Sequence, residues 1–137
     1  MATFTKYQTF VYHLASGVHN FASHTVNVAV TADTPVAATD SVYADASALA
    51  TVNGYVGGGY TTANTLTVVS GSAAIVGTDV SFTATGAVGP FRYAFLYNDS
   101  GSGDPLIGYW DYGSEVTLAS GEVFTIDFAA SGMFTVT

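Results

Sequence analysis

Three histidines, His13, His19 and His24, are the side chains of this sequence best suited to bind a metal ion or to transfer a proton. Histidine is a common metal ligand, and it titrates near neutral pH. Spacings of six and five residues do not place two of these histidines on one helical turn, and no neighbouring residue adds the carboxylate that a metal centre would need. We therefore expect structural or surface roles for all three.

The patterns of nucleophilic and acid–base catalysis are also incomplete. Gly101-Ser102-Gly103 lacks the strand-to-helix context of a nucleophile elbow. Asp99 and Asp104 lack the twelve-residue spacing and terminal Glu of a calcium loop. Carboxylates such as Asp111 and Glu115 could form a glycosidase pair, but no recognisable frame places them together. The sequence predicts no catalytic residue, no metal ion and no cofactor, and a hydrolase stays only as a third alternative.

The loop from Asn53 to Tyr60, NGYVGGGY, is the most distinctive glycine-rich stretch. Phosphate-binding glycine loops follow a strand, precede a helix and usually involve a lysine. This loop instead leads into a strand pattern over residues 61–70, so we do not expect a nucleotide site. Its glycines are predicted to permit positive φ or a close backbone approach, with Tyr55 and Tyr60 as flanking anchors.

The charge of the chain limits what it can bind. Two basic residues, Lys6 and Arg92, stand against ten carboxylates, which gives a net charge of −8. This balance argues against direct binding to nucleic acid or to an anionic membrane. No apolar run approaches the ~20 residues of a membrane span, and the first 17 residues lack the order of a signal peptide. We expect synthesis and assembly in the cytoplasm.

The composition suits one domain that belongs to a larger assembly. The 137 residues are 49% hydrophobic, which is enough for one core without metal or disulfide support, and cysteine is absent. Charged residues make up 9% of the chain, well below the roughly 25% typical of soluble domains. Gly, Thr, Ser and Ala fill the polar positions instead, which predicts a weakly charged, adhesive surface.

The clearest strand pattern lies in Phe91–Tyr97, within the stretch 89–128 that organises the rest of the chain. Its odd positions are all aromatic and are expected to share one face, while Ala94 and Leu96 make the other face apolar, so we predict a central strand. Arg92 is expected to reach solvent or to pair with Asp111 or Asp127. Further strands are predicted over residues 26–31, 66–69, 79–85, 106–112, 116–118, 123–128 and 132–137, with a break at Gly113-Ser114.

One helix is predicted over Thr3–Ala15. Thr3 can cap it, Gly17 lies just beyond its end, and apolar residues recur at spacings of three and four. That stripe is expected either to cover the chain's own sheet or to dock on a neighbouring subunit. A second, short helix is possible over 43–49. The pattern predicts a mainly β protein, an antiparallel β-sandwich or jelly-roll-like single domain over residues 1–137 with an N-terminal α-helix.

Three stretches of the sequence, taken in their order along the chain, resemble a known protein family. They are Val18-His19-Asn20-Phe21, the glycine loop at Asn53–Gly58, and the segment from Gly89 to Gly113 that contains GPFRYA, LYND, DPLIG and WDYG. Through these stretches the chain resembles, over nearly its whole length, a family of small virion proteins from tailed bacteriophages. The resemblance implies a non-enzymatic, multi-copy structural protein, a capsid decoration or cement protein that binds the assembled shell and stabilises it.

The resemblance also implies a capsid-surface location in the virion and two partners, the major capsid protein and further copies of the chain in a homo-oligomer such as a trimer. Aromatic and apolar anchors tend to carry the energy of such contacts. The interface residues expected from the sequence are Phe4, Tyr7, Val11, Tyr55 and Tyr60.

A tail- or fibre-associated receptor- or glycan-binding module is the alternative function. Aromatic rings exposed in loops would then act as stacking platforms for a sugar. The candidate platforms are Tyr55, Tyr60, Tyr109 and Trp110.

Overall fold

The structure is a computed structural model that describes residues 2–137. Within them, the elements in chain order are β1 (Phe4–Lys6), α1 (Gln8–Ala15), β2 (Val26–Thr31), the 3-10 helix η1 (Tyr43–Ala46), β3 (Tyr60–Thr61), β4 (Thr65–Val69), β5 (Ser72–Val76), β6 (Val80–Thr83), β7 (Val88–Asn98), β8 (Leu106–Leu118), β9 (Val123–Ile126) and β10 (Phe134–Val136). All paired strands are antiparallel. The predicted fold class, a mainly β single domain with one N-terminal helix, is confirmed.

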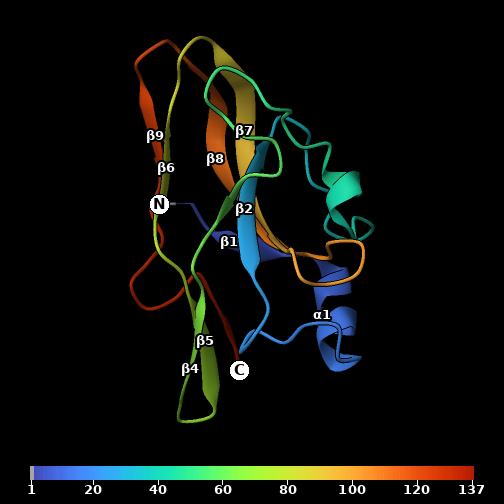
Figure 1. Ribbon diagram of the computed structural model, residues 1–137. Coiled ribbons are helices and arrows are strands. Elements are labelled where there is room, and N and C mark those ends of the chain that lie inside the picture. Colours follow the sequence, from blue (N-terminus) through green and yellow to red (C-terminus); the bar gives the residue numbers. More distant parts are fainter. Residues whose placement is uncertain (1) are drawn as a thin grey trace.

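The strands form one large sheet and two small ones. The large sheet has the order β1-β8-β7-β2-β3, and the small sheets have the orders β10-β5-β4 and β6-β9. Figure 1 shows the large sheet as the middle layer, with α1 and η1 on one side and the two small sheets on the other. The fold is therefore a sandwich whose second β layer is divided into two parts.

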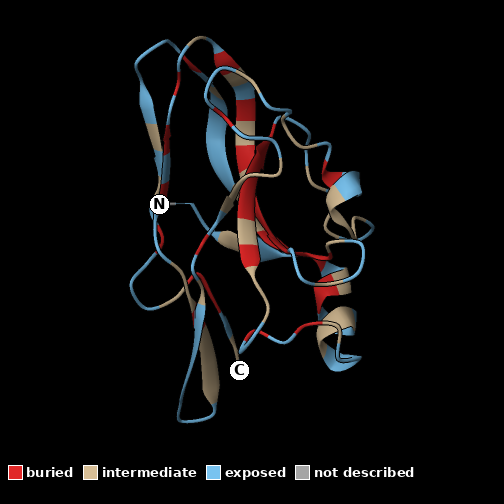
Figure 2. Ribbon diagram, viewed as in Figure 1, coloured by how far each residue is buried: buried red, intermediate tan, exposed pale blue. Residues whose placement is uncertain are grey.

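Strand β7 is central, as its sequence pattern predicts. It pairs with β2 along Tyr93–Asn98 and with β8 on its other edge. Buried residues concentrate on β2 and β7, whereas β4, β9 and the outer half of β8 are largely exposed (Figure 2). Both faces of β7 are covered because the middle layer is enclosed by α1 and η1 on one side and by the small sheets on the other.

The pairing of β7 with β8 is irregular near Phe91, and the aromatic residues of β7 do not alternate there as predicted. The register with β8 shifts between Phe91 and Tyr93. Tyr93 packs against Tyr109 with ring centroids 6.3 Å apart, whereas Phe91 packs edge-on against Phe124 of the second layer at 5.0 Å. From Tyr93 to Phe91 the partner on β8 changes from Asp111 to Val116, so the extra residues of this bulge lie in β8, and the side chains on either side of it take opposite faces of the sheet. The prediction that all four odd positions share one face is therefore wrong at Phe91.

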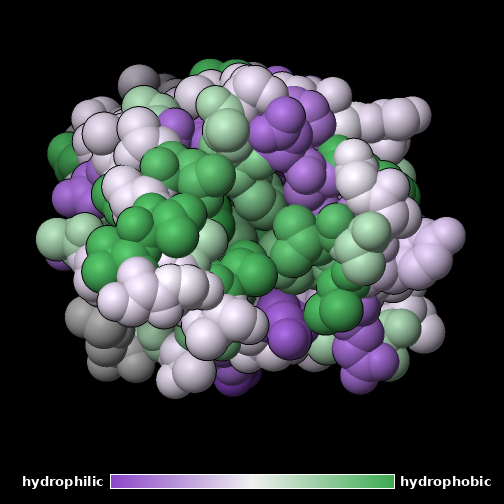
Figure 3. Space-filling view, turned by 90° about the horizontal axis from the view of Figure 1, so that it is seen from below, coloured by the Kyte–Doolittle hydropathy of each residue, from purple (hydrophilic) through white to green (hydrophobic). Residues whose placement is uncertain are grey.

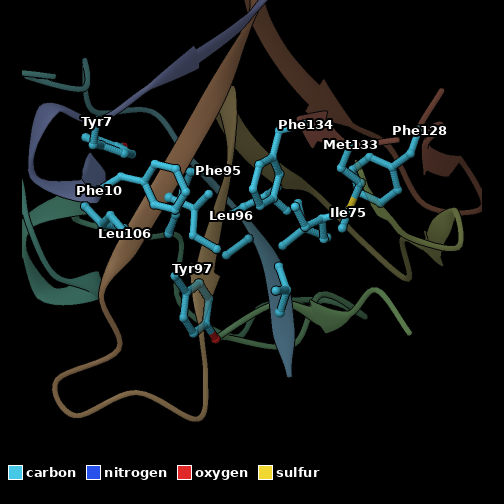
Figure 4. Close-up of a cluster of buried hydrophobic side chains, with 14 of the residues drawn as sticks. Tyr7, Phe10, Ile75, Phe95, Leu96, Tyr97, Leu106, Phe128, Met133 and Phe134 are labelled. Atoms are coloured by element: carbon cyan, nitrogen blue, oxygen red, sulfur yellow. The ribbon is translucent and has the colours of Figure 1, made fainter. Parts of the chain in front are cut away.

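The main hydrophobic core joins α1, the large sheet and the β10-β5-β4 sheet. Figure 4 shows Phe10 and Phe134 within it, together with buried residues of β5, β7 and β8. Phe10 of α1 meets Phe134 of β10 edge-on at 5.8 Å, and Phe21 meets Phe134 at 5.4 Å. Burial of each aromatic ring of this kind removes about 150–250 Å² of side-chain surface from water. This cluster therefore holds α1 and the β10-β5-β4 sheet to the large sheet.

A second cluster fills the other end of the molecule. It contains Val30, Tyr55, Phe82 and Phe91, with Phe124 packed against it. The rings of Tyr55 and Phe82 stack at 5.2 Å. This cluster fastens the β6-β9 sheet and the glycine loop to the large sheet.

The helix is shorter than the predicted Thr3–Ala15, because Phe4–Lys6 form a strand of the large sheet instead. Phe4–Lys6 pair with Gly108–Trp110 of β8, and the Tyr7 amide donates a hydrogen bond to the Ile107 carbonyl (3.1 Å). Those backbone groups are satisfied across the strand pair, so α1 begins at Gln8, and Thr3 does not cap it.

The predicted break in β8 at Gly113-Ser114 is also wrong. The strand runs without interruption from Leu106 to Leu118. Gly113 has φ +96° and donates its amide hydrogen to Oδ1 of Asp111 (2.8 Å). A glycine can take this conformation at little cost, so β8 continues through this point, although its pairing with β7 is irregular between Asp111 and Val116.

Candidate functional site

Two of the three histidines, His19 and His24, meet at one buried side chain, Asn98 at the end of β7, and His13 packs against His19 with ring centroids 6.1 Å apart. The Asn98 amide nitrogen lies 3.0 Å from Nδ1 of His19 and 2.9 Å from Nδ1 of His24. Its Oδ1 accepts hydrogen bonds from the amides of Ser100 and Gly101. This fixes the amide orientation, so its nitrogen donates to both rings and both Nδ1 atoms are acceptors. This grouping was not predicted, because Asn98 is distant from the histidines in the chain.

The cluster has the properties of a structural tie between two loops. His19 is 7% exposed, and its Nε2 has no hydrogen-bond partner in the described structure. Burial, followed by the nearby rings of His13 and His24, lowers the pKa of His19 to about 4. Among residues 2–137, no three His, Cys, Asp or Glu side chains lie close enough to hold a metal ion. The neutral His19 ring joins the loop after α1 to the turn after β7.

The glycine loop is built for close packing. Gly59 has φ +78°, and a Cβ at this position would overlap the carbonyl oxygen of Val28. The hydroxyl of Tyr97 donates to the Gly58 carbonyl. The hydroxyl of Tyr60 accepts from the Val56 amide at 3.1 Å. The prediction of a positive-φ loop in close backbone contact, anchored by tyrosine, is confirmed.

Arg92 pairs with Asp111, one of the two predicted partners. Its Nε and a terminal nitrogen donate to the two carboxylate oxygens at 2.8 and 3.1 Å. The hydrogen bonds with Arg92, and then the Gly113 amide, lower the pKa of Asp111. Both side chains are well exposed, so the pair contributes little to stability.

A groove of about 250 Å³ opens between the large sheet and β9. Trp110, Phe124 and Phe128 give it an aromatic lining, and Arg92 and Asp127 add a charge of each sign. Such a concave, mainly apolar site with a few polar groups is a common form of ligand pocket. It was not predicted, because its lining residues come mainly from β7, β8 and β9, which are distant from one another in the chain.

The structure places the five predicted interface residues in different surroundings. Tyr7 and Tyr55 are each 1% exposed, and burial raises the pKa of both hydroxyls. They are core residues, so their assignment to an interface is wrong. Phe4 is half-buried against Trp110 and Phe134, and Tyr60 is half-buried against Phe82. Val11 is exposed and available to a partner.

The outer face of α1 is an uncharged surface around Val11. Gln8, Val11, Tyr12 and Ala15 are all exposed and recur at helical spacing. Val11 is 49% exposed and Tyr12 is 71% exposed. We call these four residues the helix face. The sequence pattern indicated Val11 but not Tyr12, because Val11 belongs to the predicted apolar stripe with Phe4 and Tyr7, and Tyr12 lies outside that stripe.

The β4–β5 hairpin is the second uncharged surface. No Asp, Glu, Lys or Arg occurs between Asp45 and Asp79. Every residue of β4 is exposed, with Val68 at 64% and Val69 at 73%. Figure 3 views the molecule from the end to which the hairpin projects and shows apolar side chains gathered across the middle and left of that face. Exposed apolar patches of this kind are typical of interaction sites.

The described structure offers binding surfaces more clearly than a reaction centre. Comparison of the chain with models of known protein families, with curated proteins and with solved structures finds no match. In the described residues, no helix is long and apolar enough to cross a membrane.

Proposed function

We propose that this protein is a non-enzymatic structural protein of a bacteriophage virion, a decoration protein that binds the assembled capsid shell and stabilises it. The sequence resemblance supplies the context of a phage particle. The observation that supports attachment to the shell is the exposed helix face. It presents Val11 and Tyr12 to solvent, while Phe10 holds the helix to the core. An exposed aromatic on a firmly anchored element is a suitable binding hot spot.

The mechanism is preferential binding to the assembled state. A protein that binds the complete shell but not free capsid subunits stabilises the shell by mass action, and the effect grows with its free concentration. The helix face carries no charge, so its contacts with the major capsid protein would be mainly apolar and only weakly dependent on salt.

The first test is the number of copies per purified particle, measured by quantitative mass spectrometry against the major capsid protein. A ratio near one, or a simple fraction of it, supports a decoration protein. A handful of copies would move the protein to the tail or portal and would contradict the proposal, as would equal resistance of shells with and without it to heat and low salt.

The second test addresses the helix face directly. Tyr12→Ala should lower the affinity for stripped shells by about tenfold or more, as expected for loss of an interface aromatic. Tyr112→Ala is the matched control, because Tyr112 is a comparably exposed tyrosine on β8 at 61%. Equal binding by the two variants would rule out the helix face as the attachment surface.

The alternative, a receptor- or glycan-binding module, is favoured by one observation, the aromatic groove beside β9. Tyr55 is buried and Tyr109 is packed against Tyr7 and Tyr93, so neither is a free platform. Trp110 lines the groove and is the single tryptophan of the chain, so its fluorescence reports binding there. A glycan array without hits and an unchanged emission spectrum on addition of host surface glycans would exclude this alternative.

A further inference from the structure

The outer edge of β4 is an unpaired strand edge. β4 is the terminal strand of the β10-β5-β4 sheet, and it pairs only with β5 in the described structure. Figure 1 shows the hairpin projecting beyond the end of the large sheet, so the body of the molecule does not cover it. An exposed edge presents free N–H and C=O groups to another strand, and proteins normally protect such edges with charges, prolines or bulges. β4, with the sequence TLTVV, has no charge and no proline.

The geometry of the hairpin identifies which backbone groups are free. Ser70 and Gly71 have φ of +51° and +78°, the positive values that a two-residue type I′ turn requires. The flanking residues Val69 and Ser72 therefore form a hydrogen-bonded pair, and the alternation of an antiparallel ladder makes Thr67 and Thr65 the next such residues. The N–H and C=O groups of Leu66 and Val68 consequently point outward, away from β5.

We propose that β4 is a self-association edge, at which two copies of the chain pair their β4 strands antiparallel about a two-fold axis with Thr67 opposite Thr67 of the second copy. In this register Leu66 lies opposite Val68 of the second copy, and their outward groups form hydrogen-bonded pairs. Leu66 and Val68 of both copies then make one apolar cross-strand stripe. The two threonines meet in the pair between them. Apolar and Thr–Thr cross-strand pairs both stabilise antiparallel sheets.

Charge favours a second copy as the partner. Each chain carries a net charge of −8, and a contact through most of its surface would bring carboxylates together. The hairpin lies within the stretch between Asp45 and Asp79, which contains no charged residue. Two hairpins can therefore meet without placing a charge in the contact. A two-fold arrangement also closes, so pairing stops at a dimer and does not continue into a fibre.

The length of the β4 edge limits the expected affinity of the dimer. Five residues of strand extend about 17 Å, and pairing along that length buries less than the roughly 1,600 Å² of a standard stable interface. We expect a dimer with a micromolar or weaker dissociation constant, populated where the local concentration is high. This inference goes beyond the proposed function, because it concerns association of the chain with itself and holds wherever the protein acts.

Single-cysteine variants test the register, because the natural chain has no cysteine. Thr67→Cys places two thiols on directly opposed residues, with Cα atoms about 4.5 Å apart, within reach of a disulfide. Val69→Cys is the matched control on the same exposed strand. In the proposed register the two Val69 positions lie about 13 Å apart, beyond the reach of a disulfide. Under oxidised glutathione, the Thr67→Cys dimer should form at least about tenfold faster than the Val69→Cys dimer.

Sedimentation velocity of the unmodified chain provides the second measurement. The sedimentation coefficient should rise with concentration from a monomer to a dimer value. Val68→Lys should abolish this rise, because it places two cations near each other at the pairing edge. Val123→Lys is the control, because Val123 is similarly exposed, at 60%, on β9. A monomer at all concentrations, a dimer that survives in Val68→Lys with its native circular dichroism, or equal cross-linking of the two cysteine variants would each overturn the proposal.

Discussion

His19 and Asn98 show how residues suited to chemistry are used to hold two loops together. The Asn98 amide can bridge the two rings only while both Nδ1 atoms are unprotonated. His19 is only 7% exposed, so water does little to offset the cost of a charge there. The cluster therefore depends on neutral histidine.

This dependence predicts that stability falls in mild acid. The pKa of His19 is lowered to about 4 from 6.5, so below pH 6.5 the unfolded state takes up a proton that the folded state does not take up until about pH 4. Stability from this residue is complete above pH 6.5 and is lost as the pH falls towards 4, by about 3 kcal/mol at most. Urea unfolding of the wild type and of His19→Gln at pH 7, 6 and 5 measures it. The difference between the two proteins should shrink with decreasing pH, and a constant difference would contradict the assignment.

At the scale of elements, the local sequence pattern predicts the central strands well. It predicts poorly those segments whose structure is decided by pairing with a distant part of the chain. Alternation located β2 and β7, and glycine composition located the packed loop before β3. The apolar spacing of Phe4 and Tyr7 suited a helix, but the free edge of β8 offered these residues a strand partner. Short strands such as β1 and β3 have no pattern of their own, since pairing alone defines them.

The candidate site was less accessible to sequence reasoning for a similar reason. Tyr55 and Tyr60 were identified as anchors of the loop, but the sequence does not reveal that Tyr55 points into the second core cluster. The exposure of Tyr12 depends on Phe10 being the residue that faces the core. Which side of an amphipathic element is free follows from the partner it packs against, and that partner is distant in the chain.

Helix α1 is predicted to depend on a single anchor. Phe10 is its one fully buried residue and contacts His19, Phe21 and Phe134. Phe10→Ala should lower the free energy of unfolding by about 3–5 kcal/mol. Tyr12→Ala, an aromatic truncation two residues along the same helix, should change it by no more than about 0.5 kcal/mol because Tyr12 is exposed. Thermal or urea unfolding compares the two, and similar losses would show that the helix is anchored differently.

At the scale of the whole molecule, charge and apolar surface are separated along the chain. The charge-free stretch between Asp45 and Asp79 contains β3, β4 and β5, and the carboxylates lie before and after it. α1 likewise has no acidic or permanently basic side chain. Figure 1 shows α1 and the β4–β5 hairpin on different sides of the large sheet, so pairing at β4 would leave the helix face free for a different partner.

This separation predicts an unusual salt dependence of self-association. Two bodies of charge −8 repel each other at long range, while the paired β4 edges contribute no ion pair. Raising the salt concentration from 0.01 to 0.15 M shortens the screening length from about 30 to about 8 Å, so it should remove most of the repulsion and strengthen the dimer. Sedimentation velocity at the two salt concentrations measures the change. An interface held by ion pairs would weaken under the same change, so dissociation on adding salt would contradict pairing through the hairpin even if a dimer is present.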